Sequence, residues 1–327
     1  MNTQNIIGQS LLVEKMDQIL SSGRIVHAYL FTGPAGAGKK TLSSLFAQAL
    51  ICEGQGDKPC CTCHTCKQFQ TGNHPDIIWV RQEKDKNSIS INQIRDMQAE
   101  IKVKPYQAGK RIYFIERAQT LTEQAQNALL KTLEEPPPHT LIFLLADNTN
   151  ALLPTILSRC QTFRVRSMGR EDVTHIIKNR LGLSDDEAMT YAGLSQGIPG
   201  RGLALAENQE FRNNREILLE GVGLVGTLKI LELASVFTEN KDNVDNLLDI
   251  LLLWFRDLLV LRETRGIDLI INMDKISLLN EQVKVFTSRA LKDIIELVEE
   301  SRKIIKRNGN YQLTIENMLL GFQGGAH

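Results

Sequence analysis

Short apolar runs alternate with helical patterns along the first half of the chain. Runs of this kind, bounded by turn residues and separated by amphipathic segments, are typical of a parallel sheet with helices on both faces. The runs expected to form strands are 27–31, 77–80, 112–115, 141–146 and 161–165. The sequence therefore predicts an α/β domain at the start of the chain.

The pattern changes to helices alone after residue 167. Segments 170–181 and 201–207 have helical periodicity, and Ser184 precedes an acidic turn that is typical of a helix start. The second half is therefore expected to be all-α, so the predicted fold class is α/β plus all-α.

Long helices are expected from about residue 213 onward. Segments 282–291 and 292–306 have the spacing of amphipathic helices. The run 247–255 is apolar on nearly every side, and such a helix must be buried within the protein or against a partner.

The stretch from Gly33 to Thr41 joins an expected strand to an expected helix. Strand, glycine-rich loop and helix form the context of a phosphate-binding loop, because backbone N–H groups and the helix N-terminus can surround phosphate oxygens. Gly33, Gly36 and Gly38 would shape the loop, and Lys39 would direct its charge at the outer phosphates. We therefore expect a nucleotide-binding fold at this position.

Two departures from the usual pattern affect the metal and the attacking water. The residue after the loop lysine is normally a serine or threonine that holds magnesium, but here it is Lys40, and Thr41 points about 100° further round the helix. A later strand ends in Glu116, which could hold magnesium, but the following Arg117 cannot act as a base. We expect a loop shaped for ATP or ADP but no hydrolysis by this chain alone. The alternative is a loop retained only for its shape.

Five of the six cysteines lie between residues 52 and 66. Cys52, Cys60, Cys63 and Cys66 have spacings that suit a tetrahedral structural zinc, with no open position for catalysis. Cys61 is adjacent to Cys60, so it is not expected to bind the same ion. The alternative is a loop of free thiols.

Composition limits the classes of function. The chain has 327 residues, 42% hydrophobic and 23% charged, with 38 basic and 38 acidic side chains. A balanced charge argues against strong binding to nucleic acid by the chain alone. The first residues are polar rather than a secretory signal, and the longest apolar run is far shorter than the ~20 residues of a membrane helix. A cytoplasmic protein with reduced thiols is expected.

Taken in order, these features resemble the clamp-loader subunits of bacterial DNA polymerase III, and among them the delta-prime family, over residues 1–210. The resemblance is carried by segments 7–9, 27–34, 52–66, 126–137 and 155–160. It implies an AAA+ P-loop domain over 1–167 with a zinc module at 52–66, a helical lid domain over 168–210, and a helical collar domain for oligomerisation over 211–327.

The resemblance also implies roles for individual residues. Cys52, Cys60, Cys63 and Cys66 match the zinc ligands of the family. The residues that match its nucleotide site are Ile7, Gly33, Gly36, Gly38, Lys39, Lys40, Thr41 and Glu116, with Asn148 at the position that senses the terminal phosphate. Arg159 matches the arginine finger, which reaches into the ATP site of a neighbouring subunit.

The implied function is that of a non-hydrolysing subunit in a pentameric ring with gamma/tau and delta subunits, which loads a sliding clamp onto primed DNA. Lys40 and Arg117 favour this over the hydrolysing gamma/tau type, which has Ser or Thr and Glu at these positions. The first alternative is a gamma/tau-like subunit that hydrolyses ATP itself. A second is a zinc-dependent nucleic-acid binder, which the few basic residues near the cysteines, Lys58 and Lys67, disfavour.

Overall fold

The computed structural model describes residues 6–222, 227–264, 266–267 and 269–323. The chain forms two compact units, Met1–Met168 and Gly169–His327. The expected division into three domains stays a prediction.

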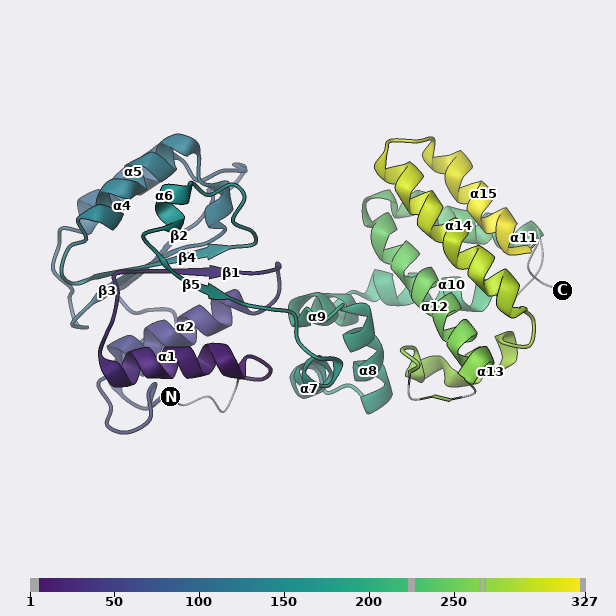
Figure 1. Cartoon of the computed structure of the whole chain (residues 1–327), viewed down its shortest axis with the longest axis horizontal. Helices are drawn as coiled ribbons and strands as arrows, with labels where there is room; N and C mark the ends of the chain where they lie inside the picture. Colours follow the sequence, from purple (N-terminus) through teal and green to yellow (C-terminus); the bar gives the residue numbers. More distant parts are fainter. Residues whose placement is uncertain (1–5, 223–226, 265, 268, 324–327) are drawn as a thin grey trace. The chain divides into compact units, whose positions relative to one another are not determined.

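Within the described part of the first unit, five strands form one parallel sheet in the order β2-β3-β4-β1-β5 (Figure 1). Every predicted strand is confirmed, with shifts of about one residue at some ends. The strands are β1 (Ala28–Thr32), β2 (Ile77–Val80), β3 (Arg111–Ile115), β4 (Thr140–Ala146) and β5 (Gln161–Arg164). All residues of β1, β3 and β4 are buried, which explains why these strands are continuous apolar runs rather than alternating ones.

Helices cover both faces of this sheet (Figure 1). Helices α1 (Ser10–Ser22) and α2 (Lys39–Ile51) pack on one face, while α4 (Ile91–Glu100), α5 (Glu123–Glu134) and α6 (Pro154–Leu157) pack on the other. The shorter elements are α3 (His64–Gln70) and η1 (Ala118–Thr120). The α/β prediction is therefore confirmed for the first unit.

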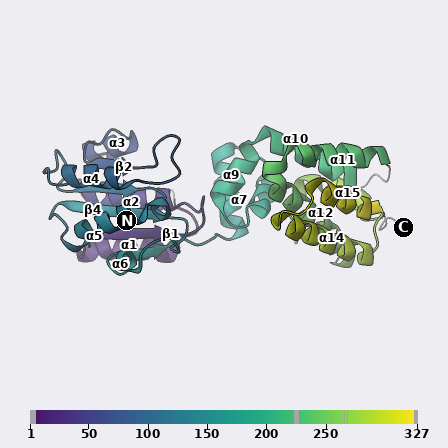
Figure 2. The same ribbon diagram turned by 90° about the horizontal axis from the view of Figure 1, so that it is seen from above.

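The described elements of the second unit are helical (Figure 2). They are α7 (Arg170–Leu181), α8 (Asp185–Leu194), α9 (Pro199–Glu207), α10 (Gln209–Val222), α11 (Thr227–Glu239), η2 (Lys241–Asn243), α12 (Val244–Thr264), η3 (Met273–Lys275), α13 (Ile276–Gln282), α14 (Ser288–Lys306) and α15 (Tyr311–Gln323). Ser184 caps α8 in a capping box with Glu187, as the sequence predicts.

The predicted burial of the apolar run in α12 is also confirmed. Leu248, Leu251 and Phe255 are fully buried, and so is Trp254, whose indole N–H donates to Gln282 at 2.8 Å. Helix α12 packs against α14, which lies beside it in Figure 2. The run is buried within the unit itself, so no partner is needed to explain it.

The predicted amphipathic helix over 282–291 is wrong. Helix α13 ends at Gln282, and α14 begins at Ser288. The Thr287 side chain accepts the backbone N–H of Ala290 at 3.2 Å, so it starts a new helix, and the preceding Phe286 is buried. The apolar side chains of segment 282–291 keep helical spacing although the helix is interrupted between α13 and α14. The cap at Thr287 sets where the second helix begins.

Asp249 of α12 connects three helices of the second unit. Its two carboxylate oxygens each lie 2.5 Å from a guanidinium nitrogen, one of Arg201 in α9 and one of Arg302 in α14. The Asp249 side chain is 12% exposed, so both pairs are largely shielded from water. This contact directs the side chain of Arg201 toward α12.

We expect Asp249→Asn to lower the free energy of unfolding by about 2–3 kcal/mol, because it leaves the partly buried guanidinium of Arg201 without a carboxylate and that of Arg302 with only the more exposed Asp245, at 3.6 Å. The measurement is urea unfolding of the full chain followed by tryptophan fluorescence. Asp185→Asn is the matched control, since Asp185 pairs with Lys178 but is 70% exposed, and its loss should cost below about 1 kcal/mol. Equal shifts of the two unfolding midpoints would contradict a special role for Asp249.

Candidate functional site

Loop 33–38 connects β1 to α2 at the carboxyl edge of the sheet. Gly33 has φ of 152°, and a Cβ atom there would lie 2.1 Å from the carbonyl oxygen of Val165, so only glycine fits beside β5. Gly36 and Gly38 have φ of 81° and 96°, values that favour glycine. Helix α2 then begins at Lys39, and its first-turn N–H groups lie at the loop, as in a phosphate-binding site.

Lys39 is folded back into the loop. Its ammonium nitrogen lies 2.7 Å from Gly33 O, 2.9 Å from Pro34 O and 2.7 Å from Asp147 Oδ1. Only 9% of the Lys39 side chain is exposed. The charge that would face the outer phosphates is therefore paired within the protein.

Asp147 and Gln119 were not identified from the sequence. Asp147 follows the last residue of β4, the strand beside β1, and its second carboxylate oxygen accepts the Gln119 amide at 2.8 Å. The backbone N–H of Asp147 donates to Gln119 Oε1 at 3.1 Å, so the two side chains hold each other. The position of an acid directly after a buried strand was the available signal, and it is the signal that singled out Glu116.

Lys40 and Glu116 meet in the structure. Lys40 Nζ lies 3.4 Å from Glu116 Oε1, while Arg81 Nε lies 2.8 Å from Glu116 Oε2. Both cations also lie over the ring of Trp79, with Lys40 Nζ at 4.8 Å and the Arg81 guanidinium carbon at 5.0 Å from the ring centroid. Glu116 thus has a cation on each oxygen.

These residues do not fit a magnesium ion. Magnesium needs oxygen ligands in near-octahedral geometry, but Lys40 supplies an ammonium and both oxygens of Glu116 already contact cations. Thr41, the nearest hydroxyl in sequence, is exposed. Arg117 donates to Gln82 at 3.0 Å, and a guanidinium cannot deprotonate water.

A cavity of about 1090 Å³ adjoins the loop. Its lining starts at Gly8, the residue after Ile7, and includes the start of α1, Gly33, Pro34, the residues around Asn148 and the end of β5. The Asn148 side chain is exposed and accepts the backbone N–H of Asn150 at 3.1 Å. Of the expected nucleotide residues, Gly33 and Asn148 line this cavity and Ile7 directly precedes its lining. The other expected residues, Gly36, Gly38, Lys39, Lys40, Thr41 and Glu116, are not part of the lining.

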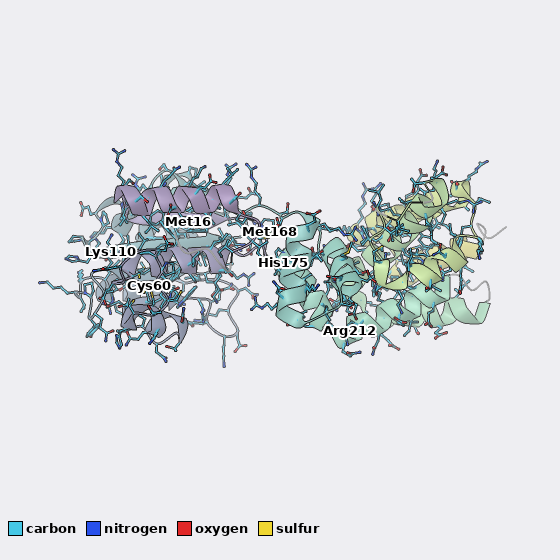
Figure 3. All side chains as sticks on the ribbon, turned by 90° about the horizontal axis from the view of Figure 1, so that it is seen from below. Met16, Cys60, Lys110, Met168, His175 and Arg212 are labelled. Carbon is cyan, nitrogen blue, oxygen red and sulfur yellow. The ribbon has the colours of Figure 1, made fainter. Side chains whose placement is uncertain are left out.

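Cys52, Cys60, Cys63 and Cys66 converge on one point, and Cys60 is labelled in Figure 3. Their sulfur atoms all lie within 4.8 Å of one another, and those of Cys60 and Cys66 are 4.0 Å apart. Four sulfurs at about 2.3 Å from a tetrahedral zinc are about 3.8 Å apart, so the cluster could hold this ion. Cys61 is exposed and lies outside the cluster.

The surroundings of the sulfurs favour a bound cation. The backbone N–H of Cys63 donates to Cys60 Sγ at 3.3 Å and, with contacts from Thr62, lowers the pKa of Cys60 to about 5. Burial raises the pKa of Cys66. Thiols this close cannot all ionise without a positive charge between them, which a zinc ion would supply.

Gly54 lies against the cysteine cluster. A Cβ atom at this position would lie 2.5 Å from Cys60 Sγ and 2.7 Å from Cys60 Cβ. Any larger residue would therefore push Cys60 away from the other sulfurs.

Arg159 follows α6, just before β5 begins. Its guanidinium lies 2.8 Å from a carboxylate oxygen of Glu134 and donates to the carbonyl of Thr155 at 3.0 Å, while 35% of its side chain is exposed. A cavity of about 630 Å³ beside it is also lined by Lys110 and residues 136–138. Burial lowers the pKa of Lys110.

The parallel register separates Arg159 from loop 33–38. Tyr29 pairs with Gln161, so Arg159 lies level with residue 27, at the amino edge of the sheet. Six residues of extended chain separate that level from Gly33, which corresponds to roughly 20 Å. Arg159 therefore cannot reach a ligand in the loop of its own chain.

No helix in the described ranges has the length and apolar character needed to cross a membrane.

Comparisons with known proteins agree with one another. A family model described as the delta subunit of DNA polymerase III matches residues 8–169, and one for its C-terminal part matches residues 209–324. The chain is 30% identical over 315 residues to DNA polymerase III subunit delta' of Bacillus subtilis (strain 168), covering 94% of this chain and 93% of that relative.

Two further relatives extend this comparison. DNA polymerase III subunit delta' of Escherichia coli (strain K12) is 31% identical over 210 residues, which cover 64% of this chain and 63% of that protein. DNA polymerase III subunit tau of Bacillus subtilis (strain 168) is 26% identical over 341 residues, which cover 96% of this chain but 60% of that protein. The two matching family models and the 30% identity over 94% of this chain lead to one conclusion: the chain belongs to the delta-prime subunit family of bacterial DNA polymerase III.

Proposed function

We propose that this chain is a clamp-loader subunit that does not hydrolyse ATP itself and that completes the ATP site of a neighbouring subunit with Arg159. The observation that carries the proposal is the place of Arg159, at the opposite edge of the sheet from loop 33–38. The guanidinium of Arg159 cannot contact phosphates bound in the loop of its own chain, so it is free to contact phosphates bound to a neighbouring subunit.

The contacts of Arg159 fit this role. Its pair with Glu134 is exposed on both sides, 35% and 51%, so it contributes little stability and can be exchanged for a phosphate at small cost. The hydrogen bond to the carbonyl oxygen of Thr155 orients the guanidinium while no phosphate is bound. A cation supplied in trans stabilises the charge that develops on a transferred phosphoryl group and can raise the rate by about 10³–10⁵-fold.

The candidate nucleotide site supports the absence of hydrolysis. Lys39 is paired with Asp147, Glu116 is paired with Lys40 and Arg81, and Arg117 replaces the base. Catalysis of phosphoryl transfer depends mostly on the positioning of the metal ion and the attacking water. The ion pairs of Lys39 and Glu116 and the replacement at Arg117 therefore remove the groups that would position them.

The proposed assembly is a pentameric ring with gamma/tau and delta subunits in the cytoplasm, which loads a sliding clamp onto primed DNA. In it, residues 1–167 form the AAA+ P-loop domain, 168–210 the lid and 211–327 the collar that joins the subunits. The relationship to both delta' and tau proteins supports a place among clamp-loader subunits.

The cysteine cluster is proposed to hold a structural zinc. Four sulfur ligands leave no open coordination position, so the ion would connect the end of α2 to α3 rather than perform chemistry.

Replacement of Arg159 tests the proposed function. In the reconstituted clamp-loader complex, Arg159→Ala should reduce turnover at the ATP site that it completes by about 10³-fold, which lowers DNA-stimulated phosphate release and clamp loading together. Arg159→Lys should not restore them, because an ammonium lacks the planar fork that matches phosphate oxygens. Arg180→Ala, at an exposed arginine of α7, is the matched control. Normal turnover and loading with Arg159→Ala would refute the finger role.

Phosphate release by the isolated chain separates the proposal from the gamma/tau-like alternative. The chain alone, with ATP and magnesium, should release no phosphate above the protein-free rate, because the metal and base positions are occupied by Lys40 and Arg117. Steady release that scales with protein concentration would instead support the ATPase alternative.

Gly54→Ala should weaken zinc binding by about 10–100-fold, the usual cost of disturbing the residues around metal ligands. Its Cβ atom would collide with Cys60. The measurement is zinc retained by the purified chain against a graded chelator. Gly109→Ala is the control, since a Cβ there has no neighbour within 4 Å. If both variants retain zinc like the unmodified chain, the cluster does not hold the ion as proposed.

A further inference from the structure

The second residue of α2 places a cation where a phosphate-binding loop normally has a metal. Lys40 directly follows the loop lysine, and its ammonium contacts Glu116, the carboxylate at the end of β3. In loops that use magnesium, the hydroxyl after the lysine and the strand-end acid hold the ion between them. Here the residue after the loop lysine is Lys40, and its ammonium contacts the strand-end acid, Glu116, directly.

This ammonium is held from more than one side. Glu116 lies 3.4 Å away, and the face of Trp79 lies below it. Trp79 stacks on Phe114 of β3 with ring centroids 4.2 Å apart and planes 9° apart, so the aromatic surface is fixed to the sheet. Arg81 fixes Glu116 from its other oxygen. These contacts keep the ammonium of Lys40 close to α2, although about half of its side chain is exposed.

The charges around the loop favour an anion and oppose a divalent cation. Lys39 is neutralised by Asp147, whereas Lys40 and Arg81 share one carboxylate, Glu116, which leaves the group with a net positive charge. A magnesium ion bound to Glu116 would lie next to the positive charges of Lys40 and Arg81, which repel it. A phosphate group would meet a positive charge and the first-turn N–H groups of α2.

We propose that the ammonium of Lys40 takes the place of the divalent cation, so that this loop binds the phosphates of a nucleoside di- or triphosphate free of magnesium. The inference rests on the proposed non-hydrolysing role and deepens it, because a nucleotide held without magnesium is bound but not cleaved. The chain would then use nucleotide as a structural ligand.

The test is calorimetric titration of the full chain with ADP, in excess EDTA and in excess magnesium at equal ionic strength. The unmodified chain should bind ADP about tenfold more tightly in EDTA. Lys40→Thr restores a hydroxyl and frees one oxygen of Glu116, so it should reverse this preference. Lys40→Met removes the charge without adding a ligand, so it should weaken binding in EDTA and gain nothing from magnesium.

Lys86→Thr is the matched control, because Lys86 is a similarly exposed lysine that pairs with Glu83. It should leave both affinities unchanged, and circular dichroism of each variant verifies the fold. Tighter binding in magnesium by the unmodified chain, or no binding of ADP in either solution, would overturn the inference. Neither result changes the outcome of the Arg159 experiment, which reports on the neighbouring subunit's site, so a failure of this inference can be distinguished from a failure of the proposed role of Arg159.

Discussion

Parallel pairing of β1 with β4 and β5 is the constraint on which the rest of the first unit depends. It places loop 33–38, Asp147 and Glu116 at the carboxyl edge of the sheet and Arg159 at the amino edge. A mixed sheet would not separate these groups consistently, because the strand ends would alternate between edges. The separation gives the unit two chemically different edges, one with a glycine-rich loop and one with an exposed guanidinium.

The carboxyl edge is stabilised by internal charge pairs rather than left ready for catalysis. Lys39 bonds to Asp147 and Lys40 bonds to Glu116, so each basic residue at the start of α2 has an acid from a neighbouring strand. Removal of Lys40 alone would leave Glu116 with Arg81, whereas removal of Glu116 would leave two cations together over Trp79. The acid is therefore the member that holds this cluster together.

The sequence predicted those features that depend on local pattern. The strands followed from apolar runs, the capping box at Ser184 from its spacing, and the chemical defects at Lys40 and Arg117 from residue type alone. It could not predict that Asp147 bonds to Lys39, because their contact depends on which strands are neighbours. The helix expected over 282–291 failed for a related reason, since helical spacing continues through a segment where Thr287 starts a new helix.

The cysteine cluster and the loop are connected by α2. Cys52 follows the last residue of this helix, and Gln48 in its final turns donates to the carbonyl of Cys66 at 3.2 Å. The other end of α2 begins with Lys39 and Lys40. The bond between Gln48 and Cys66 near one end of α2 and the two charge pairs at its other end leave this helix little freedom to shift along the sheet. Helix α2 therefore joins the cysteine cluster to the loop over its 13 residues, a length of about 20 Å.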